Sequence, residues 1–473
     1  MLRPMNEPSF LFYDLETTGL SKPYDRVMQF GAQRTNMDLE PIGEPFNLIV
    51  ALTDEILPSP KAILTTGITP QFSQREGMSE AEFVKIIQNQ AFTTGTIVVG
   101  FNTLRFDDAF MQYTFYRNFY DPYEWGWKDG RSRWDLLDVV RMMRALRPSD
   151  IKWPSEDGKA VTKLELITKL NGISHDQAHD AMSDVYASID LARLLRDKNP
   201  KLFNYLLNIR DKKKAAEVID LNNPQPFVYT SGSFGPNYNF TSVCLPFGIP
   251  DKNGKILAYD LRYDPEEYAD YSESELNDML QTPWEEKQKS TFIPFPAKAI
   301  ALNKCPAVAP LAVLNHEDQE RIQLDIDTIK RHLAAFKDSS LQQKLSTVLK
   351  AIEYDKSEDV EGALYENFFE GADKMAIATV RNATAMTISS LKPRFNDKRL
   401  PDLFMRYKAR NFPETLTALE AKEWETYRTQ RLMRDLPEFE ENMQVESHTT
   451  DAKALSLLED LKLWAQTIMP EVD

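Results

Sequence analysis

Two carboxylates stand two residues apart in the apolar stretch "SFLFYDLETTGL", which covers residues 9–20. Side chains alternate between the two faces of a strand, so Asp14 and Glu16 are expected to share one face, with Tyr13 and Leu15 on the other. Burying a carboxylate costs free energy unless a partner compensates its charge. That partner is either an Arg or Lys in a structural ion pair or a hard cation such as Mg²⁺, which prefers carboxylate oxygens. For this pair taken alone, the ion pair is the favoured interpretation.

Two later segments carry further acidic and imidazole groups. The segment "GFNTLRFDDAF" has Asn102, Phe106 and Asp107 after a buried strand and at the start of a helix, and "AHDAMSDVYASIDLARLL" opens another helix with His179 and Asp184. Because five helical residues rotate by about 500°, His179 is expected in the loop before the helix, close to whatever Asp184 holds. Each segment alone also has a structural interpretation, since a single His is more often structural and acidic residues favour helix starts.

The order of these residues, D-x-E … N-x-x-x-F-D … H-x-x-x-x-D, resembles the signature of the DEDD superfamily of 3′–5′ exonucleases, histidine subgroup. The subgroup with Tyr uses a shorter Tyr-to-Asp spacing, which this chain lacks. The resemblance implies that Asp14 bridges two metal ions. Glu16 and Asp184 would complete the metal on the water side, and Asp107 would support the second one. His179 would be the general base.

The chemistry of phosphodiester hydrolysis explains why these residue types are needed. Two divalent ions about 3.5–4 Å apart activate the attacking water and stabilise the leaving 3′ oxygen. Four carboxylates would hold and neutralise two such ions, and we expect Mg²⁺, for which Mn²⁺ can substitute. An imidazole with an ordinary pKa of about 6.5 suits a general base. Glu16 is also expected to contact the substrate.

The resemblance extends over nearly the whole chain. The segments "FYRNFYDPYEWGW", "SRWDLLDV", "AHDAMSDVYA", "NKCP" and "RYKARNFPETL" are similar to those of bacterial exonuclease I, a family that processively degrades single-stranded DNA from its 3′ end. This implies release of nucleoside 5′-monophosphates, in DNA repair and recombination. It also implies an α/β RNase H-like exonuclease domain at 1–200, an SH3-like β-barrel domain with a helical insert at 201–350 and an α-helical C-terminal domain at 351–473.

The elements expected from hydrophobic periodicity fit this order. We expect strands at 10–18 and 95–102, with two β-like runs between them, and helices at 79–92, 107–119, 132–146, 163–173 and 181–198. Short β runs with Pro and Gly are expected at 227–232, 241–249, 255–263 and 297–306, with a helical insert near 272–288. Further helices are expected at 319–336, 340–354, 421–433 and 453–468.

Residues 113–134 contain nine aromatic side chains interleaved with Arg and Lys. Core packing accounts for most of them, but rings beside cations also suit base stacking, worth about 1–3 kcal/mol per base. Tyr123 and Trp127 are the predicted strand-facing members. Further DNA contacts implied by the resemblance are Arg141, Lys163, Tyr205 and Lys304. Lys163 departs from the Arg expected there, since Lys keeps the charge for a phosphate but loses the bidentate geometry.

The formal net charge of −16 argues at first against a polyanionic partner. The charge is unevenly distributed, however, because residues 193–214 hold eight Lys or Arg against two Asp. The resemblance implies a protein partner, the acidic, Phe-ended tail of single-stranded DNA-binding protein, which binds a basic pocket. Arg147 and the basic segment 193–214 are the candidates, and a solvated charged face is the equal alternative for both. The family suggests a monomer.

Composition narrows the setting. Apolar runs are shorter than the roughly 20 residues of a membrane span, and the N-terminus "MLRPMNEPSF" lacks an apolar signal core, so we expect no membrane association or export. The two cysteines, Cys244 and Cys305, cannot form a disulfide framework and lack zinc spacing. We therefore expect a cytoplasmic protein, and the family resemblance implies a bacterial one.

Two other functions remain open at this point. One is a nuclease that trims RNA or proofreads for a polymerase, although the predicted β-barrel and helical tail argue against both. The other is a catalytically inactive DNA-binding or scaffolding protein on the same fold, which fold alone cannot exclude. Against it stands the joint presence of the acidic residues and His179.

Overall fold

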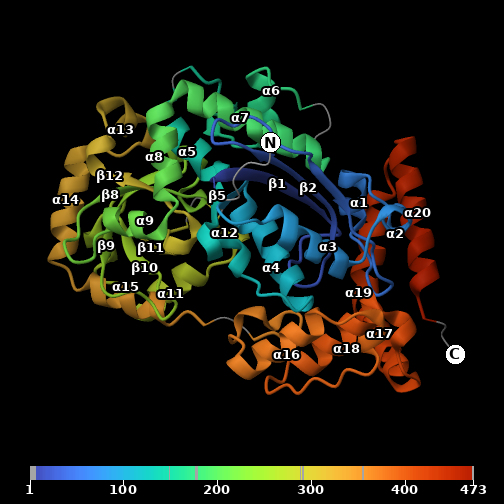
Figure 1. Ribbon diagram of the computed structural model, residues 1–473. Coiled ribbons are helices and arrows are strands. Elements are labelled where there is room, and N and C mark those ends of the chain that lie inside the picture. Colours follow the sequence, from blue (N-terminus) through green and yellow to red (C-terminus); the bar gives the residue numbers. More distant parts are fainter. Residues whose placement is uncertain are drawn as a thin grey trace. The chain divides into compact units, whose positions relative to one another are not determined.

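The computed structural model describes residues 7–148, 150–175, 179–287, 289, 292–353 and 356–470. The chain forms two compact units (Figure 1). The first unit combines residues 1–132, 175–189 and 355–473, and the second combines residues 133–174 and 190–354. The C-terminal residues thus belong to the same unit as the N-terminal ones.

The first unit is built on a mixed sheet whose strands are β1 (Ser9–Thr17), β2 (Val27–Thr35), β3 (Phe46–Ile49) and β4 (Thr96–Gly100). Its order is β3-β2-β1-β4, and β5 (Ser132–Asp135) is the fifth strand, beginning where the first unit ends. β1 pairs antiparallel with β2, next to which it is labelled in Figure 1, and parallel with β4. β1 is buried along almost its whole length, which fits its aromatic, apolar sequence.

The core of this unit lies against one face of β1 and β2. Tyr13 and Phe30 project from these strands and their rings contact Phe92, which stacks on Trp125 with ring centroids 5.0 Å apart. All four side chains are buried. Of the aromatic residues in 113–134, Phe115 and Trp125 pack on this sheet. Tyr113, Tyr116 and Phe119 are buried in a second apolar cluster, with residues of the C-terminal helices.

Helices surround the sheet of the first unit. Its helices are α1 (Pro60–Thr66), α2 (Pro70–Glu76), α3 (Glu80–Ile86), α4 (Asp107–Arg117), the start of α7 (Ala181–Lys198), α16 (Gly371–Arg381), α17 (Ala385–Ile388), α18 (Leu400–Asn411), α19 (Ala418–Glu446) and α20 (Ala452–Ile468). The C-terminal helices share an apolar cluster with the N-terminal segment, in which Met28 and Ile63 pack with Leu461 and Trp464. In Figure 1 the red helix α20 accordingly runs beside the blue α1 and α2.

The second unit contains an antiparallel sheet of order β11-β10-β9-β8-β12. Its strands are β8 (Phe227–Thr230), β9 (Thr241–Phe247), β10 (Ile256–Asp260), β11 (Ala297–Ile300) and β12 (Ala307–Pro310), with the small hairpin β6 (Ser155–Glu156) and β7 (Lys159–Ala160) outside it. Its helices are α5 (Leu136–Leu146), α6 (Leu164–Leu170), the end of α7, α8 (Pro200–Ile209), α9 (Lys212–Val218), α10 (Pro265–Tyr268), α11 (Glu273–Gln281), α12 (Trp284–Lys287), α13 (His316–Ile322), α14 (Ile326–Lys337) and α15 (Leu341–Lys350).

Several sequence expectations about elements were wrong in detail. The expected helix 132–146 is the strand β5 followed by α5, because the side chain of Asp135 accepts a hydrogen bond from Leu137 N–H and so starts the helix there. The expected helix 319–336 is two helices, since Gln323 adopts a left-handed conformation (φ 52°) that ends α13. The expected helix 79–92 ends in a π-helical turn, Ile87–Ala91.

The expected helix 421–433 is also longer, because Thr417 and Glu420 form a capping box at the start of α19. Strand β12 and helices α16 and α18 were not predicted. None of the helices in the described residues is long and apolar enough to cross a membrane.

Candidate active site

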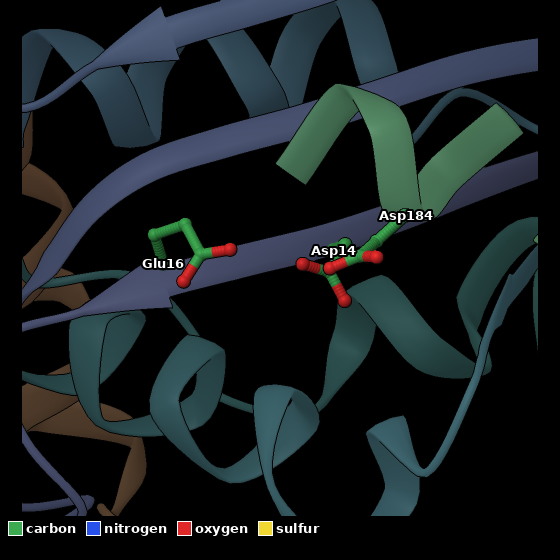
Figure 2. Close-up of side chains that lie close together, drawn as sticks. All are labelled: Asp14, Glu16 and Asp184. Carbon is green, nitrogen blue, oxygen red and sulfur yellow. The ribbon is translucent and has the colours of Figure 1, made fainter. Parts of the chain in front are cut away.

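Three carboxylates from two elements converge in the first unit. Ligand oxygens of Asp14, Glu16 and Asp184 all lie within 4.8 Å of one another (Figure 2). Strand alternation on β1 places Asp14 and Glu16 on the same face, as predicted, and Asp184 projects from the first turn of α7. The three residues are partly to fully buried.

A glycine allows α7 to approach the sheet at this point. Gly31 of β2 is directly opposite Asp14 in the β1–β2 ladder. A Cβ at Gly31 would lie only 2.7 Å from the carbonyl carbon of Ala181, the first residue of α7. The absence of a side chain on Gly31 therefore lets Asp184 reach the face that carries Asp14.

Asp107 joins the site from the other direction. It is the first residue of α4, and it follows β4 through a short turn in which Asn102 is left-handed (φ 68°), a conformation that Asn tolerates. The Asp107 side chain is buried, and its Oδ1 accepts a hydrogen bond of 3.1 Å from the backbone N–H of Leu15. Asp107 is not part of the three-carboxylate group found among the described residues, but its charge acts on both carboxylates of β1.

The site concentrates negative charge in a buried place. Burial raises the pKa of Asp14 well above its ordinary value, and the charges of Asp107, Asp184 and Glu16 raise it further. Burial, followed by the charge of Asp184, raises the pKa of Glu16 to about 9. A positive charge placed among these oxygens would lower the pKa values of both Asp14 and Glu16. The site therefore has the electrostatics that favour binding of a cation.

His179 lies in the turn just before α7, as the sequence predicted. It is exposed and has a positive φ of 70°. Its backbone N–H donates a hydrogen bond of 3.3 Å to Asp184 Oδ2. The backbone of His179 thus holds a site carboxylate while its side chain faces solvent.

A second histidine, which the sequence reasoning missed, contacts the same carboxylate. His175 Nε2 is hydrogen-bonded to Asp184 Oδ1, and its side chain is only 4% exposed. Burial raises the pKa of Asp184, and the hydrogen bond and charge of His175 oppose that rise. The only signal in the sequence was the repetition of His at a spacing of four residues in "SHDQAHD", which has no fixed meaning by itself.

Asp180 is a further carboxylate that was not predicted. Its Oδ1 accepts the N–H of Ser183, which is helix capping, and its Oδ2 accepts a hydrogen bond of 3.4 Å from Gln29 Nε2. The charge of Asp180 raises the pKa of both Asp14 and Glu16. Asp180 therefore adds to the negative potential of the site.

The two aromatic residues predicted to face DNA differ in exposure. Trp127 is 64% exposed. Tyr123 is half-buried, with its ring 5.9 Å from that of Phe368 and 6.5 Å from that of Tyr365. Phe368 and Tyr365 are themselves exposed, so Tyr123 belongs to an aromatic surface cluster shared with the C-terminal residues.

The other predicted contacts lie in the second unit. Lys163 precedes α6 and Lys304 ends a short 3₁₀ turn, and both are exposed. Tyr205 donates a hydrogen bond of 3.0 Å to the carbonyl oxygen of Val308. Burial raises the pKa of Tyr205 to about 12, so this phenol stays protonated at neutral pH.

Two predicted cationic contacts are engaged within the protein. Arg141 donates to Asp138 at 2.7 Å and lies over the ring of Phe240, 4.6 Å from its centroid. Arg147 donates to Asp318 at 2.7 Å and to the carbonyl oxygen of Val313 at 3.0 Å. Its guanidinium would have to release or share Asp318 to hold an acidic peptide.

Three protein families match consecutive parts of the chain. Their descriptions are Exonuclease over residues 11–192, Exonuclease I SH3-like domain over residues 210–351 and Exonuclease I C-terminal domain over residues 358–468. The predicted fold class, an α/β exonuclease domain followed by an SH3-like domain and a helical C-terminal domain, is confirmed.

Individual proteins match along almost their full length. The chain is 38% identical over 460 residues to the exodeoxyribonuclease I of Haemophilus influenzae, covering 96% of this chain and 97% of that one. E. coli exonuclease I in complex with a dA16 oligonucleotide has a similar structure, with a TM-score of 0.93 and 35% identity over 98% of this chain and 100% of that one. The zinc-ion-bound form of the E. coli ExoI–ssDNA complex gives the same values.

Proposed function

The chain belongs to the exonuclease I family, and on that premise we propose that it is a processive 3′–5′ exodeoxyribonuclease which degrades single-stranded DNA to nucleoside 5′-monophosphates. The observation that carries this proposal is the meeting of Asp14, Glu16 and Asp184 within 4.8 Å. The full-length similarity to enzymes named exodeoxyribonuclease I, and to a structure bound to an oligonucleotide, supports the choice of substrate.

The carboxylate site fits a hard divalent cation. All of its donor atoms are carboxylate oxygens, which such cations prefer. The carboxylates repel one another, which contributes to the raised pKa values of Asp14 and Glu16, and a bound cation would relieve this repulsion. We expect Asp14, Glu16 and Asp184 to hold one Mg²⁺, with Asp14 and Asp107 holding a second, and Mn²⁺ to substitute for either. When bound, such ions would activate water and stabilise the leaving 3′ oxygen. A relative of known structure binds zinc.

The histidines take different roles in this proposal. The exposed ring of His179 is free to meet a substrate and to accept the proton of the attacking water, as a general base does. The buried ring of His175 instead orients Asp184 by holding one of its oxygens. Glu16 is also proposed to contact the substrate.

The proposed contacts with DNA follow from the family resemblance. Trp127 and Tyr123 would stack on bases, and Trp127 has the exposure that stacking needs. Lys163 and Lys304 are exposed and would contact phosphates. Arg141 and Tyr205 would contribute through the atoms that their internal contacts leave available.

Partner, state and location follow the same resemblance. We propose the acidic tail of single-stranded DNA-binding protein as a partner of the second unit, with Arg147 exchanging Asp318 for a carboxylate of the tail. We also propose that the protein is a monomer in the bacterial cytoplasm and acts in DNA repair. Its domain limits are proposed at 200/201 and 350/351.

A substrate panel tests the proposed function. The protein is incubated with single-stranded DNA, duplex DNA and RNA of one sequence, each with Mg²⁺ or with EDTA. We expect mononucleotides from single-stranded DNA with Mg²⁺ only. Release from RNA but not DNA would indicate an RNA-trimming nuclease, and binding without release would indicate a scaffolding protein. Activity that survives EDTA would contradict the metal site.

A further inference from the structure

A buried carboxylate next to Asp107 has no part in the chemistry described so far. Asp108 is the second residue of α4 and is only 2% exposed. Its Oδ1 accepts a hydrogen bond of 2.5 Å from the hydroxyl of Tyr13, which is 1% exposed. Tyr13 immediately precedes Asp14 on β1, and by strand alternation it projects to the opposite face.

Two contacts therefore tie the start of α4 to β1, on either side of Asp14. Tyr13 Oη binds the side chain of Asp108, and the N–H of Leu15 binds the side chain of Asp107. Two residues of the strand, 13 and 15, are thus linked to two consecutive residues of the helix, 107 and 108, by hydrogen bonds across more than 90 residues of sequence. The start of α4 cannot slide along β1 without breaking one of these two hydrogen bonds.

The Tyr13–Asp108 contact has the properties of a strong positioning bond. At 2.5 Å it is at the short end of the range for O–H···O hydrogen bonds. Asp108 lies in the first turn of α4, where the helix dipole favours negative charge. Because both groups are buried, water cannot replace the lost partner if one is removed.

We propose that Tyr13 and Asp108 form a positioning pair that fixes Asp107 relative to Asp14 and so sets the spacing between the two cation positions. The pair touches neither cation nor substrate. This inference rests on the proposed function, because the spacing of two cations matters only to the hydrolysis inferred above. A hydrogen bond that served the core alone would contribute to stability but leave cation binding unchanged.

The variant Tyr13→Phe tests the pair, because it removes one hydroxyl and keeps the buried ring. The matched control is Tyr116→Phe on α4, the helix that carries Asp108; it removes the hydrogen bond of 2.9 Å from Tyr116 to the carbonyl oxygen of Val360. Three experiments are run on each variant: a thermal melt gives the Tm, an EPR titration without DNA gives the Mn²⁺ stoichiometry and affinity, and steady-state assays on single-stranded DNA give kcat and KM.

For Tyr13→Phe we expect weaker binding of the second Mn²⁺ and a fall in kcat on the order of 10²-fold, with KM nearly unchanged, since a misplacement near 1 Å has that effect. Tyr116→Phe should lower the Tm comparably and change neither Mn²⁺ binding nor kcat. Asp108→Asn, which keeps an oxygen acceptor for Tyr13, should rescue most of the kcat that Asp108→Leu loses.

Equal Mn²⁺ binding and equal kcat in the Tyr13→Phe and Tyr116→Phe variants would overturn the inference and leave the contact a core hydrogen bond. If the wild-type protein releases no nucleotide from any substrate, the proposed function fails. The Mn²⁺ titration still decides the pair in that case, because it does not depend on turnover.

Discussion

At the scale of single residues, the chemistry of the site depends on where the fold places each ionisable group. The carboxylates were predicted from their order along the chain, and the structure brings Asp14, Glu16 and Asp184 together. His175 could not be predicted, because a histidine acquires meaning only from the group that it meets, here Asp184. The same holds for Asp108, which in the sequence could be read as no more than part of an acidic helix start.

The two histidines are expected to differ in their effect on catalysis. His179→Ala should cut turnover by roughly 10²–10⁴, the usual effect of a general base, with fold and DNA binding near normal because this side chain is exposed. His175→Ala should act through the position of Asp184 and cost less. Single-turnover rates with saturating DNA check both, and unchanged activity in the His179 variant would remove the base assignment.

The carboxylates should also make the benefit of a cation depend on pH. The pKa of Glu16 is raised from 4.5 to about 9 in the folded protein. Between these values the folded state binds more protons than the unfolded state, so the stability of the cation-free protein falls as the pH rises through this window. A divalent cation takes the place of the proton.

The rise in Tm caused by Mg²⁺ should therefore be larger at pH 8.5 than at pH 6. Thermal melts at both values, with Mg²⁺ or EDTA, measure it. Glu16→Gln, which cannot ionise, should show a smaller difference between the two pH values than the wild-type protein. If Mg²⁺ raised the Tm equally at both pH values, the carboxylates would not be buried without a compensating charge in the cation-free protein.

At the scale of elements, the site depends on how closely strands and helices approach. Strand alternation and helix periodicity predicted β1, β4, α4 and α7 nearly at their observed bounds. Periodicity failed where a local hydrogen bond or backbone conformation decided the outcome, as at Asp135 and Gln323. It also missed the short strand β12, whose sequence Ala-Val-Ala-Pro shows no alternation of apolar and polar residues.

The close approach of α7 to the sheet gives a prediction for Gly31. Gly31→Ala would place a methyl group 2.7 Å from the backbone of Ala181, so the start of α7 and Asp184 must shift. We expect kcat to fall on the order of 10²-fold. Gly371→Ala is the control, since a Cβ there meets no atom within 4 Å. Equal kcat for the two variants would show that α7 can adjust without moving its carboxylate.

At the scale of the whole molecule, the C-terminal residues are part of the first unit through a buried ionic network as well as apolar packing. Arg26 pairs with Glu361 at 2.9 Å, and Arg410 pairs with both Glu361 and Glu55. Burial alone would raise the pKa of Glu361, but Arg410 and Arg26 hold it well below the ordinary value. Such pairing could not be predicted locally, because Arg26 and Glu361 are 335 residues apart.

Breaking this network should destabilise the first unit. Glu361→Gln leaves buried arginines without compensation, and we expect a loss of about 3–5 kcal/mol in the free energy of unfolding. Glu425→Gln removes an ion pair to Arg428 whose Glu side chain is 50% exposed, and it should cost about 0–1 kcal/mol. Urea denaturation of both variants makes the comparison, and similar values for the two would mean that the network contributes little.

The overall order of domains was the part most readily inferred from sequence, because family motifs recur from the N-terminus to about residue 414. The grouping of the chain into two compact units could not be inferred from sequence, since it depends on contacts between distant segments.

The most direct test of the central claim follows both ends of one strand. Single-stranded DNA labelled at its 3′ or 5′ end is mixed with the protein, and the reaction is started with Mg²⁺. We expect the 3′ label to be released as mononucleotide from the first time points, while the 5′ label stays in shortening DNA. Asp14→Asn should lower the rate at least about 10³-fold, since several kcal/mol of charge stabilisation depend on bound metal. Early release of the 5′ label, or full activity of Asp14→Asn, would contradict the account.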